Sequence, residues 1–248
     1  MQKNHVKSSL PAAVKAAFPH TLPVLAGYVF LGTAFGILLK GKGYGPVWAL
    51  AMSLFIYAGS MQFVAAGLVA AAFSPLTALA VTLLVNARHL FYGLTMLEPF
   101  SNMGWRKPYM VFSLTDETYA LLNGMKAPDT AGERDTFFMI SLLNQCYWVL
   151  GSLLGSMVGE WLTFDTNGIA FAMTALFLVI FVEQWLMAEK DKAVLGFFKA
   201  HGPAVIGVIV SAASLFLFGP DQFLLPAMGG LIVLFAVLRF YFEKAVAE

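Results

Sequence analysis

The stretch Asn86-Ala87-Arg88-His89-Leu90-Phe91-Tyr92-Gly93 lies inside an apolar run that extends from about Pro75 to Leu97. The run is long enough to cross a bilayer as one helix, which needs about 20 residues. An arginine at the centre of such a helix costs about 2.5–3.5 kcal/mol. By default such residues face a bundle interior or a wet cavity and mark a pathway or a site. The stretch therefore predicts a membrane helix whose charges are answered elsewhere in the chain.

The composition of the whole chain agrees with a membrane protein. Of 248 residues, 59% are hydrophobic and 12% are charged, whereas a soluble domain has about 25% charged residues. Unbroken apolar runs favour helices over a β-barrel, which shows short alternating segments. We expect an all-α integral membrane protein, a single membrane-embedded domain (1–248) forming a bundle of about 6–8 transmembrane helices.

Charge and cysteine content exclude several classes of function. The net charge of +1 gives no case for a nucleic-acid partner, and a single cysteine permits neither a disulfide framework nor a cysteine-based metal site. The chain has no His-Glu-x-x-His, no phosphate-binding loop and no Gly-x-Gly-x-x-Gly fingerprint. We therefore expect no cofactor and no metal.

The ends of the apolar runs indicate the orientation of the chain. Residues 1–18 are basic and form a short cytoplasmic N-terminal segment, after which Pro19 and Pro23 are expected to open the first helix. Bases gather at the N-terminus, in a mixed-charge loop expected at 189–199 and near the C-terminus, which places both termini in the cytoplasm. The later spans are expected at 137–162, 168–187, 203–218 and from 223 to about 239.

Two segments are expected to be broken or re-entrant helices. As one helix, residues 46–73 would reach about 42 Å, against a hydrocarbon core of about 30 Å. The cluster Tyr57-Ala58-Gly59-Ser60-Met61-Gln62-Phe63 marks the break. Residues 109–122 are short for a span and contain Asp116 and Glu117. Two re-entrant segments would leave six full spans, which fits the distribution of bases better than eight.

The helix around Arg88 carries two polar faces. Asn86 and His89 share one face, and Arg88 and Tyr92 share another about 200° away, at 100° per residue. Asp116 and Glu117 are the acids available to answer Arg88 within the apolar spans, apart from an acid at a helix end. The face that meets them is the better candidate for a substrate path.

Glycines at four-residue spacing predict close helix packing. Gly32 and Gly36 lie on one face of the first helix, and Gly151, Gly155 and Gly159 form a ladder in a later one. Such faces let backbones approach closely. The ladder is expected to pack within the chain or on a partner subunit.

Together, the polar clusters suggest a path through an apolar bundle. A zwitterionic substrate needs a cation or a helix N-terminus for its carboxylate and an anion or carbonyls for its ammonium. The substrate-binding candidates are Tyr57, Ser60, Gln62, Asn86, Arg88 and Tyr92, and the candidates for proton coupling or a structural ion pair are His89, Asp116 and Glu117.

Two other classes stay open at this point. Ser60 and His89 imitate the dyad of an intramembrane serine hydrolase, although Ser60 lacks a Gly-x-Ser-x-Gly elbow. A membrane scaffold subunit without a transport path fits the glycine ladder but leaves the buried charges unexplained.

Three motifs in order resemble those of the AzlC family, the large subunits of bacterial branched-chain amino acid exporters. They are Tyr57-Ala58-Gly59-Ser60-Met61-Gln62-Phe63, Asn86-x-Arg88-His89-x-x-Tyr92-Gly93 and Leu114-Thr115-Asp116-Glu117. Pro23 and Ala34-Phe35-Gly36 also fit the first helix of the family, so the motifs cover residues 20–120, and the C-terminal half matches in hydropathy alone.

The resemblance implies a secondary transporter in the bacterial cytoplasmic (inner) membrane. It implies export of branched-chain and other apolar amino acids, coupled to the proton motive force, together with a small AzlD-type membrane subunit. Gln62, Asn86, Arg88, His89, Asp116 and Glu117 stand at the family's signature polar positions.

Overall fold

The computed structural model describes residues 10–70, 75–126, 128, 130–161, 168, 171–219 and 223–243. Within these ranges the regular structure is helical, as expected, and no strand occurs. The chain divides into two compact units, Met1–Met173 and Thr174–Glu248. By length and apolar composition, three described helices suffice to cross a membrane, namely Leu10–Gly41, Gly132–Val158 and Ala200–Phe218.

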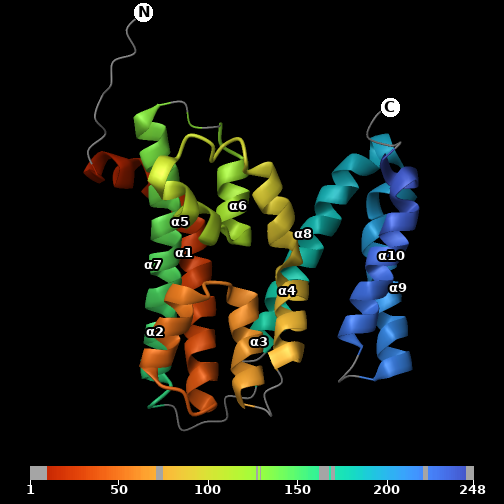
Figure 1. The fold of residues 1–248 in the computed structure, drawn as a ribbon, viewed down its shortest axis with the longest axis horizontal. Coiled ribbons are helices and arrows are strands. Elements are labelled where there is room, and N and C mark those ends of the chain that lie inside the picture. The colour runs from red at the N-terminus through yellow and green to blue at the C-terminus, as the bar shows by residue number, and fades with distance from the viewer. Residues whose placement is uncertain are drawn as a thin grey trace, which may run out of the picture. The chain divides into compact units, whose positions relative to one another are not determined.

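The first unit is built around α1 (Leu10–Gly41) and α7 (Ala131–Val158), with α4 (Pro75–Thr95) as a third long helix. The expectation that prolines open the first helix is wrong, because Pro19 and Pro23 lie inside α1, which begins at Leu10. Proline interrupts the helical hydrogen-bond ladder and kinks a helix. Figure 1 shows the first turns of α1, in red, at an angle to the remainder.

The first broken segment is a helical hairpin. It consists of α2 (Pro46–Phe55) and α3 (Gly59–Ala70), and we call it the first hairpin. The two helices are separated at Tyr57, which has a φ of +41°, in a region that non-glycine residues rarely adopt. At 1.5 Å per residue, each helix reaches about half of a 30 Å core. The break expected near Tyr57 is therefore confirmed.

The second broken segment has the same design. After the short 3₁₀ helix η1 (Gly104–Arg106), α5 (Lys107–Phe112) and α6 (Asp116–Asn123) form the second hairpin. Figure 1 shows the two hairpins in opposite halves of the first unit, each with its bend near the middle. Neither hairpin crosses the unit, which agrees with the expectation of broken helices.

The second unit contains most of α8 (Phe171–Leu195), α9 (Phe197–Phe218) and α10 (Leu224–Glu243). The mixed-charge loop expected at 189–199 is wrong, because α8 runs to Leu195 and only Gly196, at a φ of +78°, separates it from α9. The buried His201 of α9 packs against α8 and so helps to hold these two helices together on either side of Gly196. Its ring packs on Trp185 and its Nε2 lies 2.8 Å from Glu189 Oε2.

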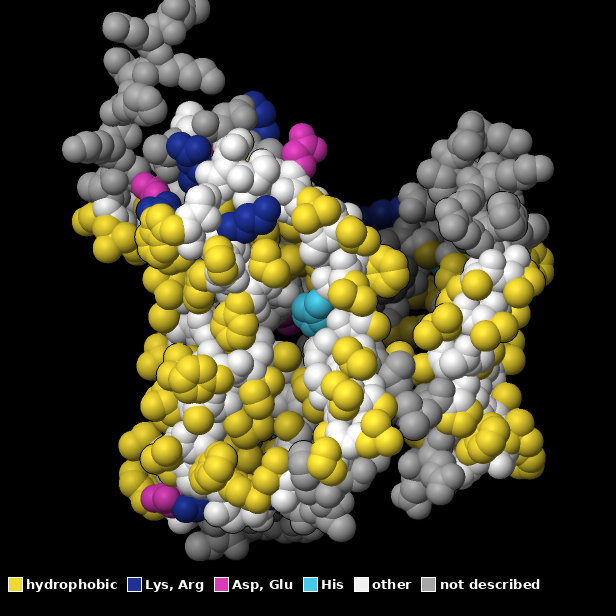
Figure 2. All heavy atoms as spheres, viewed as in Figure 1, with side chains coloured by type: hydrophobic (Ala, Val, Ile, Leu, Met, Phe, Trp, Pro, Cys, Tyr) yellow, Lys and Arg dark blue, Asp and Glu magenta, His cyan; other side chains and the backbone are white. Residues whose placement is uncertain are grey.

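The surface of the first unit has the distribution that a bilayer requires. Over its elements, Figure 2 shows a broad apolar band with charged side chains gathered toward its two ends. At half height a histidine interrupts this band beside a hollow in which an acidic side chain is visible. Large apolar side chains such as Phe30, Leu83 and Phe91 are more than 60% exposed, which is costly in water and favourable against lipid.

Candidate functional site

Arg88 joins the bends of the two hairpins. It extends from α4, and its Nε donates a hydrogen bond to Asp116 Oδ1 at 2.8 Å. Its Nη2 donates to Ser60 Oγ at 3.1 Å. Ser60 lies in the first turn of α3, and Asp116 is the first residue of α6. The Arg88 guanidinium therefore links the N-terminus of α3, in the first hairpin, to the N-terminus of α6, in the second.

The two adjacent acids have different surroundings. Asp116 is paired with Arg88, whereas the Oε2 atom of Glu117 accepts a hydrogen bond from the Tyr28 hydroxyl of α1 at 2.7 Å. That hydroxyl also lies 2.6 Å from Thr115 Oγ1. The face of α4 that meets the carboxylates is thus the Arg88 face.

Gln62 holds the first hairpin together. It is fully buried, its Nε2 donates to Ser53 Oγ at 3.3 Å, and its Oε1 accepts from Trp148 Nε1 at 2.8 Å. Gln145 Nε2 faces the carbonyl oxygens of Ser53 and Leu54 at 3.4 and 3.3 Å. These carbonyls end α2 and have no helical partner. The contacts place Gln62 in a supporting position inside the first hairpin.

We expect Trp148→Phe to weaken this support. The substitution keeps an aromatic ring but leaves Gln62 Oε1 buried without a donor, which costs about 1–3 kcal/mol. Thermal unfolding of the purified protein in detergent measures the loss. The matched control is Trp161→Phe, because Trp161 is 81% exposed. Equal melting temperatures for the two variants would contradict the assigned role of Gln62.

The second hairpin is fastened to α7 through hydroxyls and an amide. Thr115 is the N-cap of α6, where its Oγ1 accepts from the Thr118 backbone N–H at 3.3 Å. Asn144 Nδ2 donates to Thr118 Oγ1 at 3.0 Å. Tyr109 of α5 donates to Gln145 Oε1 at 2.7 Å. Asn144 of α7 therefore holds the second hairpin, and Gln145 holds both hairpins.

The remaining sequence candidates lie on α4 and at the bend of the first hairpin. His89 Nδ1 lies 3.2 Å from the Asn86 carbonyl of its own helix, and the His89 ring meets Tyr92 edge to face. The Tyr92 ring stacks on Tyr119 with centroids 4.2 Å apart, and its hydroxyl lies near Asp116. Two buried oxygens, Asn86 Oδ1 and the Tyr57 hydroxyl, have no hydrogen-bond partner among the described residues.

The geometry gives little support to a serine hydrolase. Ser60 Oγ accepts from Arg88, and His89 Nδ1 faces backbone of its own helix. A nucleophile needs its base within hydrogen-bond reach, about 2.6–3.2 Å, and no hydrogen bond joins Ser60 to His89 in the described part of the chain.

The glycine ladder packs inside the chain. A Cβ built on Gly155 would lie 2.0 Å from the Thr33 carbonyl oxygen, and one on Gly151 would lie 2.8 Å from the backbone carbonyl oxygen of Tyr28. A Cβ on Gly159 would meet the Lys40 side chain at 3.2 Å. The ladder thus lies along α1, where it lets the backbones of α1 and α7 approach more closely than any larger residue would permit.

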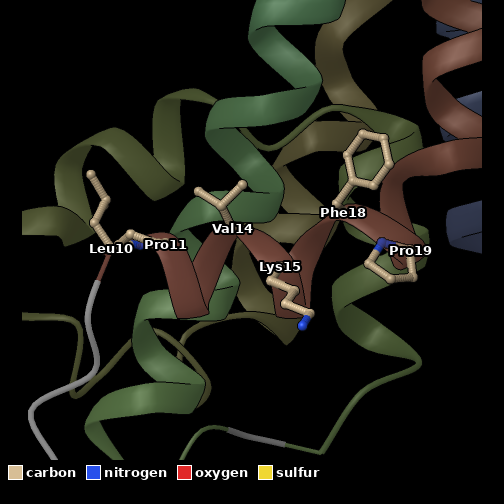
Figure 3. A pocket seen from close by; sticks show the side chains of 6 residues that line it. All are labelled: Leu10, Pro11, Val14, Lys15, Phe18 and Pro19. Atoms are coloured by element: carbon tan, nitrogen blue, oxygen red, sulfur yellow. The ribbon is translucent and has the colours of Figure 1, made fainter.

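A groove of about 740 Å³ lies at the N-terminal end of α1, apart from the polar centre. Its lining is almost entirely apolar, as Figure 3 shows, and consists of Leu10, Pro11, Val14, Lys15, Phe18 and Pro19. None of these residues belongs to the polar centre, and the groove offers a single charge for a zwitterion.

Sequence reasoning missed Tyr28 as a site residue. A signal was present, because Tyr28, Gly32 and Gly36 are spaced by four residues and so share the face of α1 that packs on α7. Tyr28 is 3% exposed and its ring meets Trp148 edge to face. A hydroxyl on a glycine-lined packing face has to find a partner inside the bundle.

Comparisons with known proteins agree with the sequence motifs. The chain is 42% identical to the branched-chain amino acid transport protein AzlC of Bacillus subtilis over 239 residues, covering 96% of this chain and 90% of the relative. It is 45% identical over 227 residues to an uncharacterized membrane protein of Helicobacter pylori, covering 92% and 95%. A more distant relative, the inner membrane protein YgaZ of Escherichia coli, is 24% identical over 196 residues, covering 76% and 78%.

No solved structure matches the chain. The model of the family described as AzlC protein matches residues 23–162, which include both hairpins, α4 and the glycine ladder. This membrane protein belongs to the AzlC family.

Proposed function

We propose that the chain is the large subunit of a secondary transporter that exports branched-chain and other apolar amino acids. It works with a small AzlD-type membrane subunit in the bacterial cytoplasmic membrane and uses the proton motive force. The name of the Bacillus subtilis relative supports the substrate class. The whole chain, 1–248, acts as one transporter domain.

The single observation that carries this proposal is the position of Arg88. It lies between the N-termini of α3 and α6, where Ser60 and Asp116 accept its hydrogen bonds. Half-helix N-termini carry partial positive charge and bind anionic substrate groups in transporters with discontinuous helices. Arg88 and these termini suit the carboxylate of an amino acid, and the adjacent acids suit its ammonium group.

The arrangement also suits alternating access. α1 followed by the first hairpin, and α4 followed by the second, run in opposite directions in the first unit. Opposed repeats that meet near the bilayer midplane are a common transporter design. Tyr57 interacts with Glu117 and Tyr92 with Asp116 at this centre. Asn86 and His89, on another face of α4, would border the same path.

Charges at the two ends of the first unit support an orientation with both termini in the cytoplasm. Lys15, Arg106, Lys107, Lys126 and Arg134 lie toward the end where α1 starts and α7 begins, and Lys40 and Lys42 lie toward the other. Cytoplasmic loops carry the excess of bases. The hairpins do not cross, so six helices would span the membrane, namely α1, α4, α7, α8, α9 and α10.

Leucine counterflow tests the proposed function. Liposomes with the chain and its small subunit, loaded with unlabelled leucine, are expected to accumulate labelled leucine transiently. Liposomes with either protein alone should accumulate much less. Failure of the two proteins together to exchange leucine, isoleucine or valine would contradict the proposal.

A further inference from the structure

Asp116 and Glu117, the two neighbouring acids of the second hairpin, differ in whether a cation pairs with them. Arg88 neutralises Asp116. No ion pair joins Glu117 to a Lys, Arg or His in the ranges that the structure describes. An ionised carboxylate at this depth is costly unless a positive charge accompanies it. Glu117 therefore needs a positive partner that the described part of the chain does not supply.

In the described part of the chain, the side-chain hydrogen bond to Glu117 comes from a tyrosine hydroxyl and not from a cation. Tyr28 donates to its Oε2 at 2.7 Å, and Thr115 Oγ1 lies 2.6 Å from the same tyrosine hydroxyl. The Tyr57 hydroxyl interacts with the Tyr28 and Thr115 hydroxyls and with Glu117, but among the described residues none of these contacts has the geometry of a full hydrogen bond. Tyr57 is only 3% exposed. A buried hydroxyl left unpaired beside a carboxylate suggests that a polar occupant belongs there.

The polar groups around Glu117 lie where α1 and the bends of the two hairpins meet. Tyr28 comes from α1, Tyr57 from the bend of the first hairpin, and Thr115 and Glu117 from the bend of the second. A ligand at Glu117 therefore touches both hairpins, and it lies within electrostatic range of Arg88 and Asp116.

We propose that Glu117 is an exchange site at which the ammonium group of the amino acid and a single proton alternate, with Tyr28, Tyr57 and Thr115 ordering the occupant. The inference deepens the proposed function and rests on it. Arg88 receives the carboxylate of the substrate, and Glu117 receives its ammonium.

Alternation at one carboxylate couples the two fluxes. Arrival of an ammonium group releases the proton from the Glu117 carboxyl, and departure of the amino acid leaves the carboxylate to take up a proton. The hairpins then rearrange only when one occupant is present, because an empty ionised Glu117 lacks its countercharge. One proton crosses inward for each amino acid that leaves.

The sign of the pH dependence follows from this competition. The ammonium group binds only the ionised carboxylate, so the affinity for leucine should rise with pH until Glu117 is fully ionised. A single competing proton allows at most about a tenfold change per pH unit. The titratable or charged groups facing Glu117 from the described elements are Tyr28 of α1, Tyr57 of the first hairpin, Arg88 of α4 and Asp116 of α6.

Proton release on leucine binding tests the inference. The full chain, purified with its small subunit in weakly buffered detergent solution, is mixed with leucine between pH 6 and 8. The natural protein should release up to about one proton per leucine bound, with tighter binding at higher pH. Glu117→Gln should release none, bind at least about tenfold more weakly, and show an affinity independent of pH. Glu117→Asp should restore proton release with a displaced pH profile.

The control variant is Glu98→Gln, which makes the same chemical change at an exposed acid outside the hairpins and should behave as the natural protein does. Proton release that persists in Glu117→Gln overturns the inference. Loss of proton release in a His89→Gln variant that keeps Glu117 also overturns it, because the proton would then come from His89. Leucine binding without proton release in the natural protein also overturns it while leaving amino-acid transport intact. Absence of leucine binding in the natural protein refutes the proposed function itself.

Discussion

Arg88→Ala is expected to lower leucine counterflow by about 100-fold while the protein still inserts into the membrane. The variant loses the two charge-assisted hydrogen bonds to Asp116 and Ser60. Each such bond contributes about 1.5–3 kcal/mol, and about 1.4 kcal/mol corresponds to a tenfold change. It also loses the cation that would receive the substrate carboxylate. Asp116→Asn, which removes the charge that pairs with Arg88, is expected to lower exchange to a similar extent.

Two further variants give this prediction its specificity. Arg88→Lys keeps the charge but lacks the planar fork that reaches both hairpins, so most of the activity should be lost. Arg134→Ala removes an arginine whose hydrogen bond to the Asn102 carbonyl, at 3.5 Å, lies on the surface, so exchange should be unchanged. Counterflow is compared at equal amounts of inserted protein. A scaffold subunit without a transport path would tolerate the loss of Arg88 and Asp116, and normal exchange in both variants would favour it.

Gly36→Ala is expected to destabilise the protein by about 3 kcal/mol, the upper range for an overpacked core. The added Cβ would lie 2.1 Å from the Ser152 carbonyl oxygen and 2.5 Å from the Ser156 backbone nitrogen. Neither backbone atom can turn away as a side chain does, so α1 and α7 must separate. Because α7 also holds both hairpins, exchange should fall together with the melting temperature.

Gly27→Ala provides a control in the same helix. A Cβ at Gly27 meets no atom within 4 Å, so its stability should stay within about 0.5 kcal/mol of the natural protein. Gly155→Ala should resemble Gly36→Ala, since its Cβ would lie 2.0 Å from the Thr33 oxygen. Thermal unfolding in detergent compares the three variants. Similar melting temperatures for Gly36→Ala and Gly27→Ala would rule out close backbone packing of α1 on α7.

Several features of the fold followed from sequence alone because they depend on local properties. The helical class and the apolar spans follow from transfer free energies summed along a segment. The break near Tyr57 followed from a run too long for the bilayer, and that of residues 109–122 from a run too short for it. Local reasoning failed at Pro19 and Pro23, where the helix continues through a kink, and at 189–199, where charged residues extend α8.

The partners of the polar residues were decided by tertiary structure. Sequence limited the partner of Arg88 to Asp116 or Glu117, and the fold gives it Asp116 and Ser60. Gln62 lies against Trp148, which follows it by 86 positions. Glu117 meets Tyr28, which no motif had singled out.

What the sequence by itself determined is thus which segments are apolar enough to enter a membrane, where two of them break, and which polar residues need partners there. Hydropathy and backbone preference are properties of a segment and its solvent, so they can be read before any helix has a neighbour. The tertiary structure decided which acid meets Arg88 and which meets Tyr28. Those pairings depend on the close approach of α1 and α7 at Gly36 and Gly155 and on the bends of both hairpins. Such contacts join residues far apart in the chain, and their geometry exists only once the helices have packed.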